Sequence, residues 1–249
     1  MCYLSEIKNI ILFVLLVLSA CNRHKSLPPE SKANGLIHDK YYSQKKLSEY
    51  EKAFIAAGLV DIQTLSTDIK VDLKYSSKDN LFGFDAYQDL EKAYLQKDVA
   101  EKLIKAEEYL NKLLPGAKLI IYDAARPRRV QQIIWDSLKM PVSEKIKYAS
   151  NPKIGGLHNF GAAVDLNIID KNGKELDMGT PFDFMGELAQ PQAENKMLKE
   201  GKLTKQQIDN RKLLRKIMRK AGFFNIQTEW WHFNSCTREQ AFRKYKIIE

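Results

Sequence analysis

The segment GGLHNFGAAVDLNI, residues 155–168, places an acid inside an otherwise apolar strand pattern. Every second residue from Ala162 to Ile168 is aliphatic, which predicts a β-strand, and Asp165 falls on the opposite face of that strand. A carboxylate in such a segment is either a buried acid satisfied by hydrogen bonds or a metal ligand. The strand therefore constrains both the fold and the chemistry of the chain.

The rest of the chain mixes strands and helices without strict alternation, which predicts the α+β class. Residues 68–75 alternate as a strand, and residues 118–123 form a second apolar strand. Helical spacing of Val99, Leu103, Ala106, Leu110 and Leu113 predicts a helix that ends at residues 115–116. A later helix is expected over residues 204–221, with a basic outer face that includes Arg211. The aromatic segment 223–234 is strand-like.

The amino terminus is typical of an exported protein. Residues 10–19 form an apolar run that is short for a membrane span but suits a signal peptide, and it leads into LSAC, residues 18–21. This tetrapeptide resembles a bacterial lipobox, in which the cysteine, here Cys21, is lipidated. We expect residues 1–20 to be a signal peptide, residues 21–46 a tether behind the lipid, and residues 47–249 the folded domain. The alternative is an ordinary secretory signal.

Composition narrows the partners of the mature protein. Of the three cysteines only Cys236 lies beyond the expected lipid site, so no intrachain disulfide is expected to support the core. The formal net charge of +9 favours anionic membrane or wall surfaces. Because the chain carries an export signal, nucleic acid is not an expected partner. The sequence does not define an oligomeric state.

A second motif supplies what a metal site at Asp165 would need. His158 precedes Asp165, and TEWWHF contains His232 with Glu229 three positions before it. A catalytic zinc takes three protein ligands and leaves one position for water, which a nearby carboxylate can deprotonate. Residues three apart on a regular strand point to opposite faces, so Glu229 and His232 can share a site only if the strand is interrupted between them.

Arg126 is the expected electrostatic partner of such a site. It lies at the end of the strand in YDAARPRR, residues 122–129, with Asp123 placed to orient its guanidinium group. A fixed donor aimed at a developing oxyanion contributes about 3–4 kcal/mol to catalysis. Taken singly, these residues have ordinary structural explanations: a buried histidine is usually a hydrogen-bonded core residue, and Arg126 could equally form a structural ion pair.

Five ordered segments resemble the D-alanyl-D-alanine dipeptidases of the VanX type. HNFGAAVD resembles their H-x-x-G-x-A-x-D block, EWWH their E-x-W-H block, and YDAARP their D-x-x-R-P block. DLKYSSKDNLFG and MGTPFDFM resemble two further blocks. The resemblance spans about residues 70–234 and implies the α+β fold, with an antiparallel sheet flanked by helices, that is shared with certain D,D-carboxypeptidases and Hedgehog amino-terminal domains.

The resemblance also implies a role for each matching residue. His158, Asp165 and His232 would hold one Zn²⁺ per chain, Glu229 would be the base, and Arg126 would stabilise the transition state. Asp183 would lie near the free amino group of the substrate. One departure is Gly156, which stands where the family usually has a serine two residues before its first metal histidine.

The sequence therefore predicts an exported, lipid-anchored zinc dipeptidase that acts on D-alanyl-D-alanine or a related small dipeptide in wall-peptide recycling or turnover. The alternatives are a D,D-carboxypeptidase that acts on peptidoglycan stem peptides and a non-catalytic wall-binding lipoprotein. An intact Glu229 argues against the second alternative.

Overall fold

The computed structural model describes residues 47–249. The expected signal peptide, Cys21 and the tether up to residue 46 lie outside the described residues. The longer helices are α2 (Glu49–Ala56), α4 (Lys97–Leu113), α5 (Arg128–Ser137), α8 (Lys205–Lys220) and α9 (Arg238–Lys244). Shorter helices are α3 (Ile62–Leu65), η1 (Lys74–Ser76), α6 (Val142–Lys145), η2 (Leu157–Phe160), η3 (Glu187–Ala189), η4 (Pro191–Ala193) and α7 (Glu194–Lys199).

A five-stranded sheet with the order β2-β4-β5-β7-β6 organises these elements. Its strands are β2 (Lys70–Val71), β4 (Lys118–Asp123), β5 (Ala163–Ile169), β6 (Phe224–Asn225) and β7 (His232–Asn234). A separate antiparallel pair joins β1 (Leu59–Asp61) to β3 (Tyr94–Gln96). The α+β class is confirmed. The sheet is antiparallel except at one edge, where β2 runs parallel to β4.

The predicted strand over residues 68–75 is much shorter in the structure. Only Lys70 and Val71 pair with β4, and the chain then turns through η1. Of the alternating residues expected on one face of this strand, Ile69, Leu73 and Tyr75 are buried and Val71 is half-buried. The carbonyl of Tyr75 accepts hydrogen bonds from the N–H groups of residues 86 and 87, so this backbone pairs with a loop instead of a strand.

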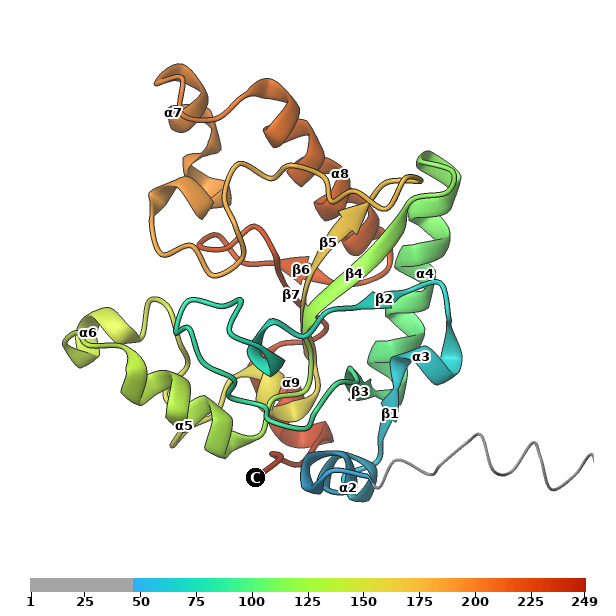
Figure 1. Ribbon diagram of the computed structural model, residues 1–249, viewed down its shortest axis with the longest axis vertical. Helices are drawn as coiled ribbons and strands as arrows, with labels where there is room; N and C mark the ends of the chain where they lie inside the picture. Colours follow the sequence, from blue (N-terminus) through green and yellow to red (C-terminus); the bar gives the residue numbers. More distant parts are fainter. Residues whose placement is uncertain (1–46) are drawn as a thin grey trace, which may run out of the picture. The chain divides into compact units, whose positions relative to one another are not determined.

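Two amphipathic helices pack on each other and on the sheet. α4 contacts both β4 and α8, and Figure 1 shows α4 on one side of β4 and β5, with α5 and α6 on the other. The predicted inner stripe of α4 is buried except for Leu113, which is exposed at the last turn. α8 begins with the predicted capping box of Thr204 and Gln207 and ends before Gly222, whose φ of +91° suits a helix terminus.

Arg211 corrects the prediction of a wholly solvated basic face on α8. Its side chain is fully buried, and its guanidinium group donates to the carbonyls of Met178 and Leu188. The helix therefore holds both stems of the segment that contains Asp183. Basic residues such as Lys212 and Lys216 are exposed, as predicted.

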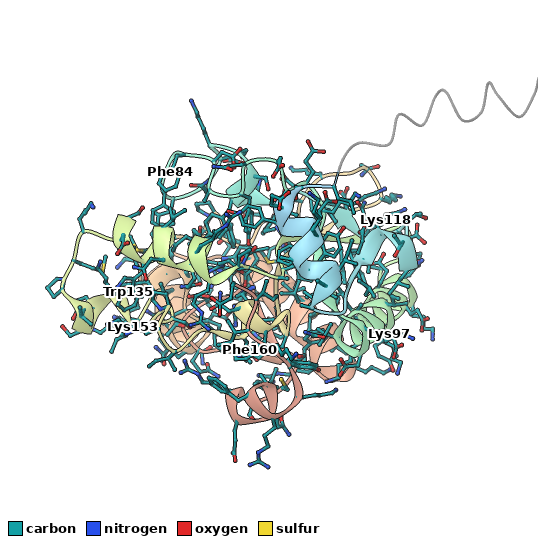
Figure 2. The ribbon with its side chains drawn as sticks, turned by 90° about the horizontal axis from the view of Figure 1, so that it is seen from below. Phe84, Lys97, Lys118, Trp135, Lys153 and Phe160 are labelled. Atoms are coloured by element: carbon teal, nitrogen blue, oxygen red, sulfur yellow. The ribbon has the colours of Figure 1, made fainter. Side chains whose placement is uncertain are left out.

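Side chains fill the space around the sheet. In Figure 2, Phe84 and Trp135 lie at one flank, and Lys97 and Lys118 lie at the opposite flank. Trp135 belongs to the buried face of α5, which borders the pocket described below. Within residues 47–249, none of the helices has the length and apolar character needed to span a bilayer.

Candidate active site

The register of the central strands brings three of the predicted residues into one row. Asp165 on β5 pairs directly with His232 on β7, and Asp123 on β4 lies opposite Asp165 on its other side. Directly opposed residues point to the same face of a sheet, so their side chains meet. His158 reaches this row from η2, which precedes β5.

Gly161 makes the approach of η2 to β5 possible. Its backbone is left-handed, with φ of +64°, and a β-carbon there would lie 2.7 Å from a methyl group of Leu59. Both the backbone conformation and the lack of space require glycine. The turn that ends at Gly161 therefore determines where the His158 imidazole lies relative to Asp165.

His158, Asp165 and His232 place three ligand atoms around one point. Each residue offers one such atom, and these atoms all lie within 4.8 Å of one another. His158 Nε2 lies 3.1 Å from His232 Nδ1 and 3.3 Å from Asp165 Oδ2, and His232 Nδ1 lies 2.9 Å from Asp165 Oδ1. Ligands at normal bond lengths around tetrahedral zinc are roughly 3.3 Å apart. The donor types and the separations both fit a zinc ion.

The outer nitrogen of each imidazole has its own hydrogen-bond acceptor. His158 Nδ1 donates to the carbonyl of Ala124 at 2.7 Å, and His232 Nε2 donates to Asn234 Oδ1 at 2.8 Å. Metal binding would require His158 Nε2 and His232 Nδ1 to be unprotonated, and their lone pairs would then face the point they share with Asp165. Outer partners of this kind hold the tautomer and the ring orientation of metal-binding histidines.

Glu229 joins the site because the last strand is interrupted. β6 ends at Asn225 and β7 begins at His232, so the residues between them do not follow strand geometry. Glu229 Oε2 lies 4.0 Å from His232 Nδ1. The interruption predicted from the spacing of these two residues is confirmed.

Burial and neighbouring charges shift the pKa values of Glu229 and Asp165. Removal from water raises the pKa of Glu229 to about 8, and the carboxylates of Asp165 and Asp183 add to this shift. Burial opposes the charge of Asp165, but His158 and His232 lower its pKa well below the usual range. A bound cation would favour the ionised form of Glu229, because opposite charges stabilise each other.

Arg126 is held rigidly beside the three candidate metal ligands, His158, Asp165 and His232, which we call the ligand row. Its Nε donates to Asp123 Oδ2 at 2.9 Å and its Nη1 donates to Gln131 Oε1 at 2.9 Å, while Nη2 lies 3.9 Å from Asp165 Oδ2. The guanidinium carbon lies 5.0 Å from the centroid of the Tyr75 ring. A guanidinium group has five N–H bonds, so donors on both Nη atoms remain free for a ligand. Arg126 therefore forms a structural ion pair and retains donors toward the site.

Asp183 occupies a conformation that side chains rarely adopt. Its φ is +60°, and Tyr75 donates a hydrogen bond to its Oδ2 at 2.7 Å. Withdrawal from water raises the pKa of the carboxyl group to about 7, and Asp165 adds to the shift. Asp adopts this conformation more readily than most residues, and here it accompanies a carboxylate that lines the pocket.

One pocket is lined by the three candidate ligands together with Glu229, Arg126 and Asp183. Its volume is about 500 Å³, within the range of small-molecule sites. The acids, Arg126 and the histidines lie among apolar residues that include Leu81, Ile134, Leu138, Phe184 and Met185. The pocket therefore offers a polar set of groups inside an apolar wall.

Gly156 stands where the family usually has a serine, and a different serine lies beside it in the pocket. A β-carbon on Gly156 would lie 2.5 Å from the hydroxyl oxygen of Ser150, and Ser150 also lines the pocket. The Ser150 hydroxyl thus fills the space that a side chain at residue 156 would need. A polar group is retained beside Gly156, in the pocket that His158 also lines, but it comes from another segment.

Three side chains of the site were missed by the sequence analysis. Gln131 links Arg126 to the carbonyl of Ser150, Tyr75 holds Asp183, and Asn234 holds His232. Asn234 has a sequence signal, since it lies two residues after His232 on the same face of β7. Tyr75 lies in η1 and has a signal only through its place in the DLKYSSKDNLFG segment. Gln131 has none beyond its place on the buried face of α5. Cys236 is a partly buried free thiol.

Comparison with known proteins identifies relatives of this chain. The chain is 34% identical over 181 residues to a D-alanyl-D-alanine dipeptidase of Escherichia coli (strain K12), covering 70% of this chain and 83% of that protein. It is 28% identical over 192 residues to one of Enterococcus faecium, covering 71% and 90%. The profile of the peptidase M15 family, described as D-ala-D-ala dipeptidase, matches residues 55–246. The chain therefore belongs to the D-ala-D-ala dipeptidase family of M15 peptidases.

Proposed function

We propose that this protein is a zinc dipeptidase that hydrolyses D-alanyl-D-alanine or a closely related dipeptide. The observation that carries the proposal is the meeting of His158, Asp165 and His232 around one point, with Glu229 and Arg126 beside it in a single pocket. Membership of the family and the names of its relatives supply the substrate class. One Zn²⁺ per chain is the cofactor to which this donor set is suited.

In this mechanism each side chain has a separate task. His158, Asp165 and His232 would hold the zinc, which would supply a Lewis acid for the scissile carbonyl group and lower the pKa of the attacking water. Glu229 accepts the proton of that water and delivers it to the leaving amine. The free N–H groups of Arg126 donate to the carbonyl oxygen as it gains negative charge.

The charge of Asp183 suits the free ammonium group of a dipeptide. An ammonium near this carboxylate would stabilise its ionised form and lower its pKa from about 7. A blocked amino terminus loses this ion pair, so the position of Asp183 favours a dipeptidase over a D,D-carboxypeptidase that acts on stem peptides.

The decisive experiment compares the wild-type protein with Glu229→Gln. Metal analysis should find one zinc per chain in both, while hydrolysis of D-Ala-D-Ala should fall by about 10²- to 10⁴-fold in the variant. Glu239→Gln is a matched control, since this side chain is exposed on α9. Preferential cleavage of a pentapeptide stem would instead identify a D,D-carboxypeptidase. Stoichiometric zinc without turnover of any small peptide would favour a non-catalytic wall-binding protein.

Export and lipid anchoring form a separate part of the proposal. The apolar run at residues 10–19 and the LSAC tetrapeptide support lipidation at Cys21, with the enzyme facing the periplasm or the cell exterior. Labelling with a fatty acid should mark the wild-type protein and leave Cys21→Ala unlabelled. A labelled Cys21→Ala protein would contradict the assignment.

A further inference from the structure

Arg238, at the first turn of α9, is a pocket-lining cation to which the mechanism above assigns no task. Within residues 47–249, three cationic residues line the pocket: Arg126, Lys147 and Arg238. Arg126 is paired with Asp123, and Lys147, which is exposed like Arg238, is paired with Glu144. Arg238 has no acidic partner among the described residues.

The contacts of Arg238 hold its guanidinium group without neutralising it. Its Nη2 donates to the carbonyl of Gly155, and its guanidinium carbon lies 6.0 Å from the Phe242 ring centroid. A guanidinium group offers N–H donors in a planar fork that matches the two oxygens of a carboxylate. Donors on Nε and Nη1 remain free for such a ligand.

A chain of contacts orders the charged groups of the pocket. At one end, Asp183 accepts a hydrogen bond from Tyr75, and the Tyr75 ring lies against the guanidinium group of Arg126. Arg126, in the middle, lies beside Asp165 of the ligand row.

The same chain continues away from Asp183. Arg126 donates to Gln131, which in turn donates to the carbonyl of Ser150. The Ser150 hydroxyl packs against Gly156, the neighbour of the residue to which Arg238 donates. Asp183 and Arg238 therefore line the same pocket and are connected to each other by contacts that pass through Arg126.

This order of charges is that of a free dipeptide, which has an ammonium group at one end, a carboxylate at the other, and the scissile amide between them. We infer that Arg238 binds the terminal carboxylate of the substrate and thereby selects peptides whose C-terminus directly follows the cleaved bond. The inference rests on the proposed function. It assigns Arg238 as the group that recognises the C-terminal residue of the substrate, which is released when the bond is cleaved.

The test compares two substrates with zinc-loaded enzyme: D-Ala-D-Ala and its C-terminal carboxamide, which lacks the negative charge. The wild type should prefer the free acid. Arg238→Gln should lower kcat/KM for the acid by about 10-fold, mainly through KM, and leave the carboxamide unaffected. Arg238→Lys should fall between them. Arg243→Gln, an exposed arginine of the same helix, should behave as wild type.

Each outcome has a distinct meaning. Loss of preference for the free acid in Arg238→Gln, with unchanged carboxamide hydrolysis, supports the carboxylate site. An equal loss on both substrates, or none on either, overturns it and leaves the proposed function intact. If the wild-type enzyme hydrolyses neither substrate, the proposed function and this inference fall together.

Discussion

At the scale of single residues, the site depends on side chains that orient other side chains. Asp123 is fully buried, and its two oxygens accept from Tyr87 and Arg126. His158 and His232 each have an oxygen acceptor behind the ring. Pre-set orientation matters because a site that is already arranged loses little free energy to reorganisation when ligand or transition state forms.

Asn234 offers a direct test of this orientation. Asn234→Ala removes the acceptor for His232 Nε2. The His232 tautomer that carries its proton on Nε2 and a lone pair on Nδ1 is then no longer favoured, so zinc affinity should fall by about 10- to 100-fold. Titration of the metal-free protein with zinc measures the change. Asn234→Asp keeps an oxygen acceptor and should retain wild-type affinity or exceed it. Equal loss in both variants would contradict the role.

Asp183 should reduce stability where it is ionised. Its pKa in the folded protein is raised to about 7, mainly by withdrawal from water. The folded state therefore holds this proton more tightly than the unfolded state, and the free energy of unfolding falls as pH rises from about 4 to about 7. Asn at this position removes the ionisation and tolerates a positive φ.

The corresponding measurement is the Tm of metal-free wild-type and Asp183→Asn protein at pH 5 and pH 8. The variant should gain several degrees relative to wild type at pH 8, where each kcal/mol corresponds to roughly 2–4 °C, and gain less at pH 5. Its KM for the dipeptide should rise. A constant difference in Tm across this range would show that the ionisation of Asp183 has no effect on stability.

At the scale of elements, α8 holds the pocket wall. Its buried Arg211 donates to the carbonyls of Met178 and Leu188, on either side of Asp183, and Asn210 donates to the carbonyl of Asp177. Trp230, from the segment that contains Glu229, donates to Thr180 in the same wall. The position of Asp183 is thus a property of several elements and not of its own segment alone.

Replacement of Arg211 tests this coupling. Arg211→Met should destabilise the protein by roughly 3 kcal/mol, because buried carbonyl groups lose their donors. The KM for the dipeptide should also rise, while zinc content stays constant, since the ligand row lies on other elements. Lys212→Met, on the exposed face of α8, should change stability by less than about 0.5 kcal/mol. Unchanged KM in Arg211→Met would contradict the coupling.

At the scale of the molecule, the candidate metal site lies beside a large hydrophobic core, which we expect to fold without metal. The buried hydrophobic cluster runs from Tyr50 to Ile248 and includes the inner faces of α4 and α8. Loss of metal should therefore leave the secondary structure intact while stability decreases, because a ligand that binds only the folded state stabilises it.

Zinc titration with thermal unfolding measures this effect. At a free zinc concentration 100-fold above Kd the gain is about 2.7 kcal/mol, or roughly 5–10 °C in Tm, and chelation should reverse it. Circular dichroism at 25 °C should be unchanged on chelation. Unfolding on chelation would instead indicate a structural metal. The same titration on His232→Ala is the control and should show little shift.

The sequence alone determined the class of the fold, the two longest helices, α4 and α8, and the residues worth testing. Strands around residues 118–123 and 163–169, and the capped helix α8, follow local periodicity and capping, which depend on near neighbours along the chain. His158, Asp165, Glu229 and His232 were selected by spacing and by the resemblance. Their roles as ligands and base, and that of Cys21, remain predictions.

Tertiary structure decided what long-range contacts control. The burial of Arg211, the shortening of the strand at residues 70–71 and its parallel pairing all result from partners distant in sequence. The same holds for the hydrogen bonds that Gln131, Tyr75 and Asn234 make in the pocket. Periodicity shows which face of an element is apolar, but only the packing of the whole chain determines which polar group lies within hydrogen-bond distance of another.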